Sequence, residues 1–345
     1  MINDLQIIHR FDPEASNAWD SYVRNHPQGT FFHLSGWAQV IKESFGHTPS
    51  YLLVKQNNTI SGVLPLGNIK SRLFGNALIS NPFCVYGGAI ADSDDLKILL
   101  EEAAEAEAIR QGVDYLELRN TTPSKQNWPI KELYVTFRKE IDPDPDINMK
   151  AIPRKQRAMV RKGIKAGLKS IISDNVDIFY KIYSTSVRNH GTPVFSKNYF
   201  KILKTVFGSD CEIRLVRHGS EYISAVMNFY YKDEVLPYYG GGLPSARKYK
   251  AFDFMYWDVM QDACQKGIRI FDYGRSKIGT GSYSFKKNWG FEPVPLPYTY
   301  RLVNLQKMPE VNPLNPKYRL FIQAWQKLPL PLANTIGPLL ARSLG

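Results

Sequence analysis

The sequence predicts an α/β fold made of two similar units in tandem. Two stretches share one order of features: a hairpin, a Gly-Gly segment, a helix and a last strand. ISGVL at 60–64 corresponds to ISAVM at 223–227, and QGVDYLEL at 111–118 corresponds to KGIRIFDY at 266–273, with offsets of 163 and 155 residues. These similar offsets favour an internal duplication over a chance likeness between two ordinary strand–helix patterns. A chain of 345 residues also exceeds what one hydrophobic core usually holds.

We therefore expect three parts. A first domain covers 1–145, a second domain covers 146–304 and begins with a basic helical segment, and a proline-rich, partly amphipathic tail covers 305–345. Each domain should contain a mixed central sheet flanked by helices.

The first half of the chain alternates strand and helix signals. A strand at 5–9 and a helix at 15–25 precede a loop that enters a helix at 31–42. Tyr51–Val54 and Ile60–Leu66 indicate a hairpin. The leucines and alanines of 95–111 recur at helical spacing up to Gly112, and 113–118 follows as a strand.

The second half repeats this order and adds a final helix with two adjacent lysines. A hairpin at 213–227 and a strand at 235–239 lead into Gly240–Gly242. A helix at 253–266 feeds a strand at 268–273, which we expect to stop at Gly274. A glycine-rich loop and a helix at 282–289, which carries Lys286 and Lys287, complete the stretch. Backbone donors and positive charge there suit an anionic or carbonyl group, although a plain turn between two core elements is the alternative.

A basic segment separates the two halves. Residues 147–173 contain eight bases and no acid. Arg154, Arg157, Arg161 and Lys165 fall on one face of the predicted helix. A solvated helical face usually mixes charge signs, so we favour phosphate binding. Nucleic acid, a nucleotide-sugar diphosphate and a lipid headgroup all remain open.

The tail contains a second basic, amphipathic stretch at 317–328. Such a helix can lie on a membrane surface or pack on its own domain. The net charge of +12 likewise suits phosphate-bearing partners or an anionic membrane surface.

Several kinds of protein lose support. The three cysteines are widely spaced, and the six histidines form no HxxxH or HExxH motif, so we expect neither a disulfide framework nor a metal site. The N-terminus has no secretory pattern, and no uncharged apolar run is long enough to span a membrane. We expect a cytoplasmic protein, with peripheral contact at the inner membrane left open. The sequence also lacks a P-loop, a G-x-S-x-G elbow and a G-x-G-x-x-G strand–helix junction.

Acyl transfer to an amine fits the features that remain. Such an enzyme must orient a carbonyl and stabilise its oxyanion with backbone N–H groups. The loops after Tyr239 and Tyr273 suit this task, and Lys286 is placed to screen a phosphate or an oxyanion. Asp272 has two open interpretations, a site residue or a structural partner of Arg269 or Arg275.

The stretch FDYGRSKIGTGSYSFKKNWGFEP at 271–293 resembles the closing motif of the Fem-type transferases, a branch of the GNAT superfamily with two tandem GNAT-like domains. PRKQRAMVRKG at 153–163 and the Trp37–Lys42 entry share the resemblance. More narrowly, the chain resembles FemAB-related proteins with a BioF2-like acetyltransferase domain, associated with exosortase/PEP-CTERM and exopolysaccharide systems. The long coiled-coil arm of some Fem proteins is absent. At the place of the GNAT pyrophosphate loop, R/Q-x-x-G-x-G/A, stands Arg247–Ala251 without the middle glycine.

The resemblance implies an acyl- or aminoacyltransferase that acts on an amine of a cell-envelope or exopolysaccharide intermediate. It implies no tightly bound cofactor; the donor is a cosubstrate, acyl-CoA or aminoacyl-tRNA. The acceptor is a phosphate-bearing small molecule or a lipid-linked one, tRNA is a further partner, and DNA is not. Two other hypotheses are a non-catalytic phosphate-recognising adaptor at the inner membrane surface and a plain RNA-binding protein.

We expect the active cleft in the second domain, between Tyr238–Gly242 and 272–286. The expected catalytic residues are Lys286, Asp272 and Tyr239. Lys42 matches the position at which the family holds the acceptor's phosphates, and Arg157 is a looser match. The expected substrate-binding residues are Trp37, Lys42, Arg154, Arg157, Arg161, Gly241, Gly242, Arg247, Tyr273, Arg275 and Tyr283.

Overall fold

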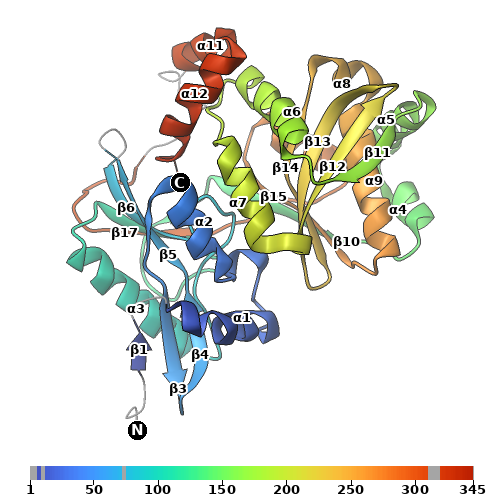
Figure 1. Cartoon of the computed structure of the whole chain (residues 1–345). Helices are drawn as coiled ribbons and strands as arrows, with labels where there is room; N and C mark the ends of the chain where they lie inside the picture. The colour runs from blue at the N-terminus through green and yellow to red at the C-terminus, as the bar shows by residue number, and fades with distance from the viewer. Residues whose placement is uncertain (1–5, 9–11, 72–74, 310–318, 345) are drawn as a thin grey trace. The chain divides into compact units, whose positions relative to one another are not determined.

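The computed structural model describes residues 6–8, 12–71, 75–309 and 319–344. It divides into two compact units (Figure 1). The first comprises the described parts of Met1–Tyr134, Pro295–Val311 and Arg342–Gly345. The second comprises the described parts of Val135–Val294 and Asn312–Ala341.

The unit boundaries differ from the expected domain bounds because two strands pair outside their expected domain. The strand β10 (Tyr134–Glu140) joins the sheet of the second unit, ahead of the expected boundary at 145. The strand β17 (Tyr298–Leu302) lies between β8 (Tyr115–Leu118) and β9 (Ile130–Lys131) in the first unit. Both assignments depend on long-range pairing, which local sequence patterns do not reveal.

The first unit contains two sheets. The four-stranded sheet has the order β1 (Gln6–Ile8), β3 (Leu52–Gln56), β4 (Thr59–Leu64), β7 (Ile90–Ala91). The six-stranded sheet has the order β2 (Thr48–Pro49), β5 (Leu66–Ser71), β6 (Gly75–Ser80), β8, β17, β9. Pro65 separates β4 from β5, and a residue without an N–H suits the point at which the chain changes sheet.

Three helices accompany these sheets: α1 (Ser16–Asn25), α2 (Gly36–Phe45) and α3 (Asp94–Arg110). The predicted helix at 95–111 is thus found within one residue. Ser93 caps it, because its side chain accepts the N–H of Leu96. Leu96 and Leu100 of α3 pack on the sheet residues Leu52 and Leu116.

The second unit is built on one seven-stranded sheet. Its order is β11 (Lys169–Ser173), β12 (Cys211–His218), β13 (Glu221–Tyr231), β14 (Glu234–Gly242), β15 (Ile270–Lys277), β10, β16 (Val294–Pro295). β14 and β15 run parallel, joined through the helix α9 (Ala251–Gln265). Parallel neighbours need such a crossover.

Helices cover both faces of this sheet. On one face lie α6 (Val176–Asn189) and α7 (Lys197–Phe207), and on the other α9 with α5 (Arg154–Lys165) and α4 (Pro145–Ala151), as Figure 1 shows. The short helices α8 (Pro244–Tyr249) and α10 (Gly281–Asn288) flank β14 and β15. The C-terminal helices α11 (Arg319–Lys327) and α12 (Leu330–Ala341) pack on α6. Lys317, expected in the tail helix, lies outside the described residues.

A buried ionic network joins α9 to the sheet. Arg214 of β12 is 5 % exposed and donates to Asp258 at 2.7 Å and to Asp262 at 2.6 Å. Lys266 bonds the Glu212 carboxylate at 3.0 Å and Asp262 at 2.8 Å. Removing one member would leave a buried charge without compensation, so this network fixes where α9 lies.

The two units share a detail that supports the duplication. The β3–β4 hairpin changes register at Val54/Lys55, and the β12–β13 hairpin changes register at Val216/Arg217. These steps lie 162 residues apart, close to the offset of the ISxV matches. In each unit a helix also precedes a strand that pairs in parallel with an earlier one. In the first unit β8 follows α3 and pairs with β6, and in the second β15 follows α9 and pairs with β14.

At Gly241, the helix α6 approaches the sheet closely. A Cβ at this position would lie 2.8 Å from the Tyr183 Cα and 3.2 Å from the Ser186 Cβ, so backbone would have to move. We expect Gly241→Ala to lower the free energy of unfolding by about 1–3 kcal/mol. Urea titration measures this change. Gly281→Ala, where a Cβ meets nothing within 4 Å, is the control and should leave stability equal or higher. Equal stability for both variants would contradict the close approach.

Candidate active site in the second unit

Strands β14 and β15 stop pairing early. They pair at Glu234↔Ile270 and Val235↔Phe271, and then continue to Gly242 and Lys277. β14 still pairs with β13 up to Gly242, although Tyr238 is an extra residue at a bulge. In such a ladder, alternate residues turn their N–H and C=O groups to the other edge. β14 therefore directs backbone donors toward the side from which β15 has diverged.

Three glycines let side chains from both faces reach this part of β14. A Cβ on Gly240 would lie 2.6 Å from the Tyr256 hydroxyl of α9, and one on Gly242 would lie 2.8 Å from the Phe252 ring. Gly241 faces α6 instead. Any larger residue would displace these neighbours. The expected contact of Gly241 and Gly242 with a substrate remains a prediction.

β15 does not end at Gly274 as expected, but runs on to Lys277. Gly274 adopts φ +63°, a left-handed conformation that glycine accepts without strain. Asp272 stabilises this bend, because its Oδ1 accepts the Gly274 N–H at 2.6 Å and the Thr136 hydroxyl at 3.4 Å. Asp272 is 1 % exposed. These two hydrogen bonds stabilise the bend and agree with a structural role for Asp272, while its part in transfer remains a prediction.

Lys286 binds the bend from the other side. Its Nζ donates to the carbonyl oxygens of Gly274 at 2.9 Å and Arg275 at 3.0 Å. Successive carbonyls of a regular strand point to opposite edges, so only the bend at Gly274 lets one amine reach both. α10 holds the lysine in place, with the Thr280 hydroxyl accepting the N–H of Tyr283 at its first turn.

Burial lowers the pKa of Lys286 to about 7. The nearby Asp272 carboxylate opposes this shift, and the Arg275 cation adds to it. Near neutral pH a large share of the side chain is therefore the neutral amine. With two protons donated to carbonyls, a neutral amine retains a lone pair that can accept a proton.

Two buried hydroxyls of β15, Tyr273 Oη and Ser276 Oγ, make no hydrogen bond to any described residue. The centroid of the Tyr273 ring lies 5.0 Å from that of Tyr256 and 4.8 Å from that of Phe291. Burial holds the pKa of the Tyr273 hydroxyl well above 10. A buried hydroxyl without a partner calls for a ligand or a water. Sequence patterns pointed to Tyr273 but missed Ser276, which lies in the same 271–293 stretch, and Tyr256, which belongs to no recognised motif.

Tyr239 occupies a different environment from the one expected. Its hydroxyl lies 2.6 Å from the Tyr199 hydroxyl, and Tyr183 and Phe200 pack against its ring. Burial raises its pKa well above 10. The structure gives Tyr239 a packing role between the sheet and the helices α6 and α7. A role of Tyr239 in transfer remains a prediction.

The remaining expected residues of the second unit lie around this region. The Tyr283 ring packs on Phe137 at 5.4 Å, and Arg275 belongs to the bend of β15. Arg247 is exposed on α8. Lys250, which follows α8, adopts φ +57° at the position where the GNAT loop pattern favours glycine. The loop thus keeps a left-handed turn without the glycine.

The basic face of α5 is confirmed as an exposed helix surface. Arg154, Arg157, Ala158, Arg161, Lys162 and Lys165 line a depression of about 470 Å³. The opposite side of the helix is buried at Val160 and Gly163, where a Cβ would lie 2.8 Å from the Phe254 Cβ of α9. This packing turns the arginines outward.

In the first unit, Trp37 and Lys42 lie on the same helix but differ in exposure. Trp37 is 0 % exposed and donates its indole N–H to the Phe31 carbonyl at 3.1 Å. Trp37 therefore packs in the core of the first unit, and its contact with a substrate remains a prediction. Lys42 is exposed on α2.

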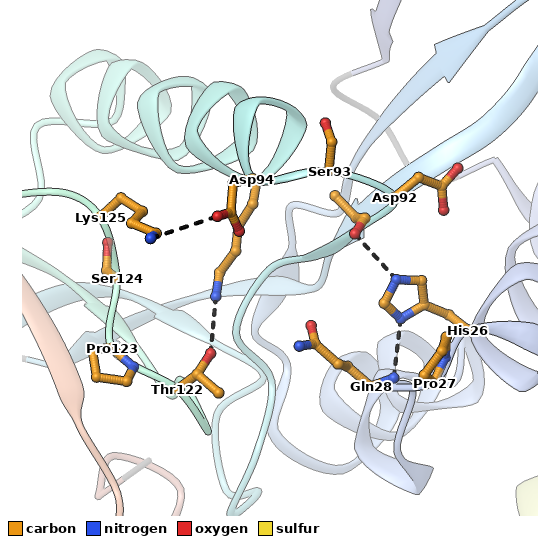
Figure 2. A pocket seen from close by; sticks show the side chains of 12 residues that line it. His26, Pro27, Gln28, Asp92, Ser93, Asp94, Thr122, Pro123, Ser124 and Lys125 are labelled. Carbon is orange, nitrogen blue, oxygen red and sulfur yellow. Dashed lines mark hydrogen bonds and ion pairs between the residues drawn. The ribbon is translucent and has the colours of Figure 1, made fainter.

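The first unit also contains a polar pocket of about 720 Å³ that sequence reasoning missed (Figure 2). It lies between the start of α3 and the segments 26–28 and 122–125. His26 Nε2 lies 3.1 Å from the Ala91 carbonyl, and its Nδ1 accepts the Gln28 N–H at 3.1 Å. Lys97 bonds the Thr122 hydroxyl at 3.3 Å, and Lys125 pairs with Asp94 at 3.6 Å. Both charge signs and several hydroxyls therefore line this pocket.

Neither a metal site nor a membrane span is seen in the described part of the chain. No group of three or more histidine, cysteine, aspartate or glutamate side chains is arranged there so that it could hold a metal ion. No described helix has the length and apolar character that crossing a membrane requires.

Comparison with known proteins finds a family match within the second unit. Residues 154–287 match the acetyltransferase (GNAT) domain family. The expectation of an acyltransferase of the GNAT type is confirmed at this level, because the matched range contains α5, β14, β15 and Lys286. The narrower link to exosortase/PEP-CTERM systems is not shown.

The fold prediction is confirmed by solved structures. The crystal structure of FemX superposes with a TM-score of 0.68, 15 % identity, and coverage of 92 % of this chain and 100 % of that one. A tandem GNAT protein from the clavulanic acid biosynthesis pathway gives a TM-score of 0.54, 10 % identity, and coverage of 88 % and 100 %. A UDP-N-acetylmuramoylpentapeptide-lysine N(6)-alanyltransferase from Weissella viridescens is 20 % identical over 301 residues, 78 % of this chain and 87 % of the relative.

The pKa of Lys286 predicts how stability depends on pH. Between about pH 7 and 10.5, the unfolded chain holds a proton on Lys286 that the folded chain has lost, so this group makes folding more favourable as pH rises. Lys286→Met removes the buried charge. Its stability relative to the natural protein should be greatest below pH 7 and decline toward about pH 10.

Urea unfolding at a series of pH values measures this difference. Lys287→Met changes the exposed neighbouring lysine. The difference between its free energy of unfolding and that of the natural protein should be the same at every pH. The same pH profile for both variants would show that Lys286 titrates like a solvated lysine.

Proposed function

We propose that this chain transfers an acyl or aminoacyl group from an activated donor to an amine of a cell-envelope or exopolysaccharide intermediate. The observation that carries the proposal is the divergence of β14 from β15 beside a buried lysine whose pKa is about 7. The GNAT domain match over 154–287 and the likeness to the alanyltransferase support it.

In the proposed reaction, the acceptor amine attacks the donor carbonyl between the two strands. Backbone N–H groups on the open edge of β14 would stabilise the oxyanion, as in other acyl transfers. A C–N bond forms, and the C–S bond of a thioester or the C–O bond of an aminoacyl ester breaks. The attacking amine loses a proton, which neutral Lys286 would accept, and the leaving thiol or alcohol gains one.

Asp272 and Gly274 are proposed as positioning residues. Their hydrogen bond sets the bend of β15, and the bend places the two carbonyls that hold Lys286. The unpartnered hydroxyls of Tyr273 and Ser276 would bind polar atoms of the donor or the acceptor.

A phosphate-bearing cosubstrate is proposed to use the α5 face. Its arginines and lysines have no acid within the segment 147–173, so an anion would relieve their mutual repulsion. Both CoA and tRNA carry such phosphates, and so does a nucleotide- or lipid-linked acceptor. Lys42 in the first unit would be a further phosphate contact.

The polar pocket of the first unit is proposed to hold the sugar or peptide part of the acceptor. Its acids, lysines and hydroxyls suit hydroxyl, amide and ammonium groups. In this proposal the first unit binds the acceptor and the second unit performs the transfer. The resemblance of 271–293 to FemAB-related sequences is the reason for including exopolysaccharide intermediates.

Lys286→Ala should lower kcat/KM for transfer by about 100-fold or more, because a buried proton acceptor is lost. The rate of the natural protein should rise with pH around a midpoint near 7 as Lys286 loses its proton. Mass spectrometry of the acceptor, with acyl-CoA and aminoacyl-tRNA offered as donors, measures the product.

Lys287→Ala is the matched control, since the two lysines are adjacent and only Lys286 is buried. It should keep the natural rate and pH profile, and circular dichroism should show both variants folded. Natural activity in folded Lys286→Ala would remove the proposed role.

A further inference from the structure

The C-terminal helices α11 and α12 each carry exposed apolar side chains. In α11, Leu320 is 78 % exposed and Phe321 is 43 % exposed. In α12, Leu332, Ile336 and Leu339 are 43 %, 36 % and 65 % exposed. The spacing of 332, 336 and 339 places the last three on one face of the helix.

The inner side of the pair is already used for packing. Trp325, Ala333, Gly337 and Ala341 are buried. The Arg188 guanidinium of α6 donates to the Leu328 carbonyl at 2.8 Å, and the Gln326 amide donates to the Asn189 carbonyl at 3.2 Å. The exposed face of α12 is therefore not the face that holds it to the second unit. A helix with exposed apolar residues opposite or beside its packed face calls for a second apolar environment.

The charge of the pair selects the kind of surface that would cover it. Residues 319–341 contain Arg319 and Lys327 and no aspartate or glutamate. Both bases are exposed at the two ends of α11. Large aliphatic side chains combined with cations, without acids, match the boundary of an anionic bilayer, in which acyl chains lie below negative headgroups. A second copy of the chain would offer no negative charge from this same face.

We propose that α11 and α12 dock the second unit on an anionic phospholipid surface. Leu320, Leu332, Ile336 and Leu339 insert at the acyl boundary, while Arg319 and Lys327 contact headgroup phosphates. Docking needs no substrate and does not depend on the proposed transfer. Given that transfer, docking brings the enzyme to acceptors that are anchored in a membrane.

Vesicle co-sedimentation tests the docking. The full chain should bind vesicles that contain phosphatidylglycerol, and bind phosphatidylcholine vesicles about tenfold or more weakly, because each base near an anionic surface contributes about fivefold. The double variant Leu320→Glu/Leu339→Glu should bind anionic vesicles at least about tenfold more weakly than the natural chain. Both side chains are largely exposed, so the fold should not change.

Ile109→Glu is the matched control, an aliphatic-to-acid change at a 56 % exposed position of α3 in the first unit. It should bind vesicles like the natural chain. Equal binding by the double variant and the control would overturn the proposal, and so would equal binding to neutral and anionic vesicles. Dimers in solution that the double variant dissociates, without vesicle binding, would assign the face to a second copy instead.

A transfer assay with a water-soluble acceptor separates this proposal from the proposed function. The double variant should retain the natural rate there and lose rate only with an acceptor embedded in vesicles. Loss of rate with both acceptors would show that the face serves the reaction itself and not the membrane.

Discussion

The geometry of the candidate site depends on the point at which β14 and β15 stop pairing. After two residue pairs the strands diverge. The backbone N–H and C=O groups on their facing edges then lack the inter-strand hydrogen bonds of a regular sheet. The bend at Gly274 directs two successive carbonyls toward one point, and the Lys286 amine binds both. Binding them requires burial, and burial lowers the pKa of the amine to about 7. A backbone constraint thus leads to a side chain with the acid–base properties that amide formation needs.

Sequence patterns were sufficient for most elements of the fold, and they led to the proposal for Lys286. Helical spacing predicted α3 and α9, the run of bases predicted the exposed face of α5, and the FK step within 271–293 pointed to Lys286. These features are local, so a single stretch of chain carries the whole signal. The duplication was also visible, because its hairpins and final strands repeat at similar offsets.

The remaining features depend on contacts between distant residues. Tyr239 pairs with Tyr199, forty residues away, and no pattern marks that contact. Trp37 was assigned to binding, yet Phe31 and Phe32 enclose it in the core. β15 continues past Gly274 because the Asp272 carboxylate accepts the Gly274 N–H. The prediction that the glycine ends the strand did not take this hydrogen bond into account. The pairing of β17 with β8 and β9 likewise requires the folded chain.

Photoaffinity labelling tests most directly whether transfer takes place between β14 and β15. Acyl-CoA and aminoacyl-tRNA analogues with a photoreactive acyl group would be irradiated with the natural protein, and the labelled peptides identified by mass spectrometry. The account predicts labels within 238–242 and 273–276, suppressed by excess natural donor. Suppressible labels confined to the first unit, with none on these two strands, would contradict it.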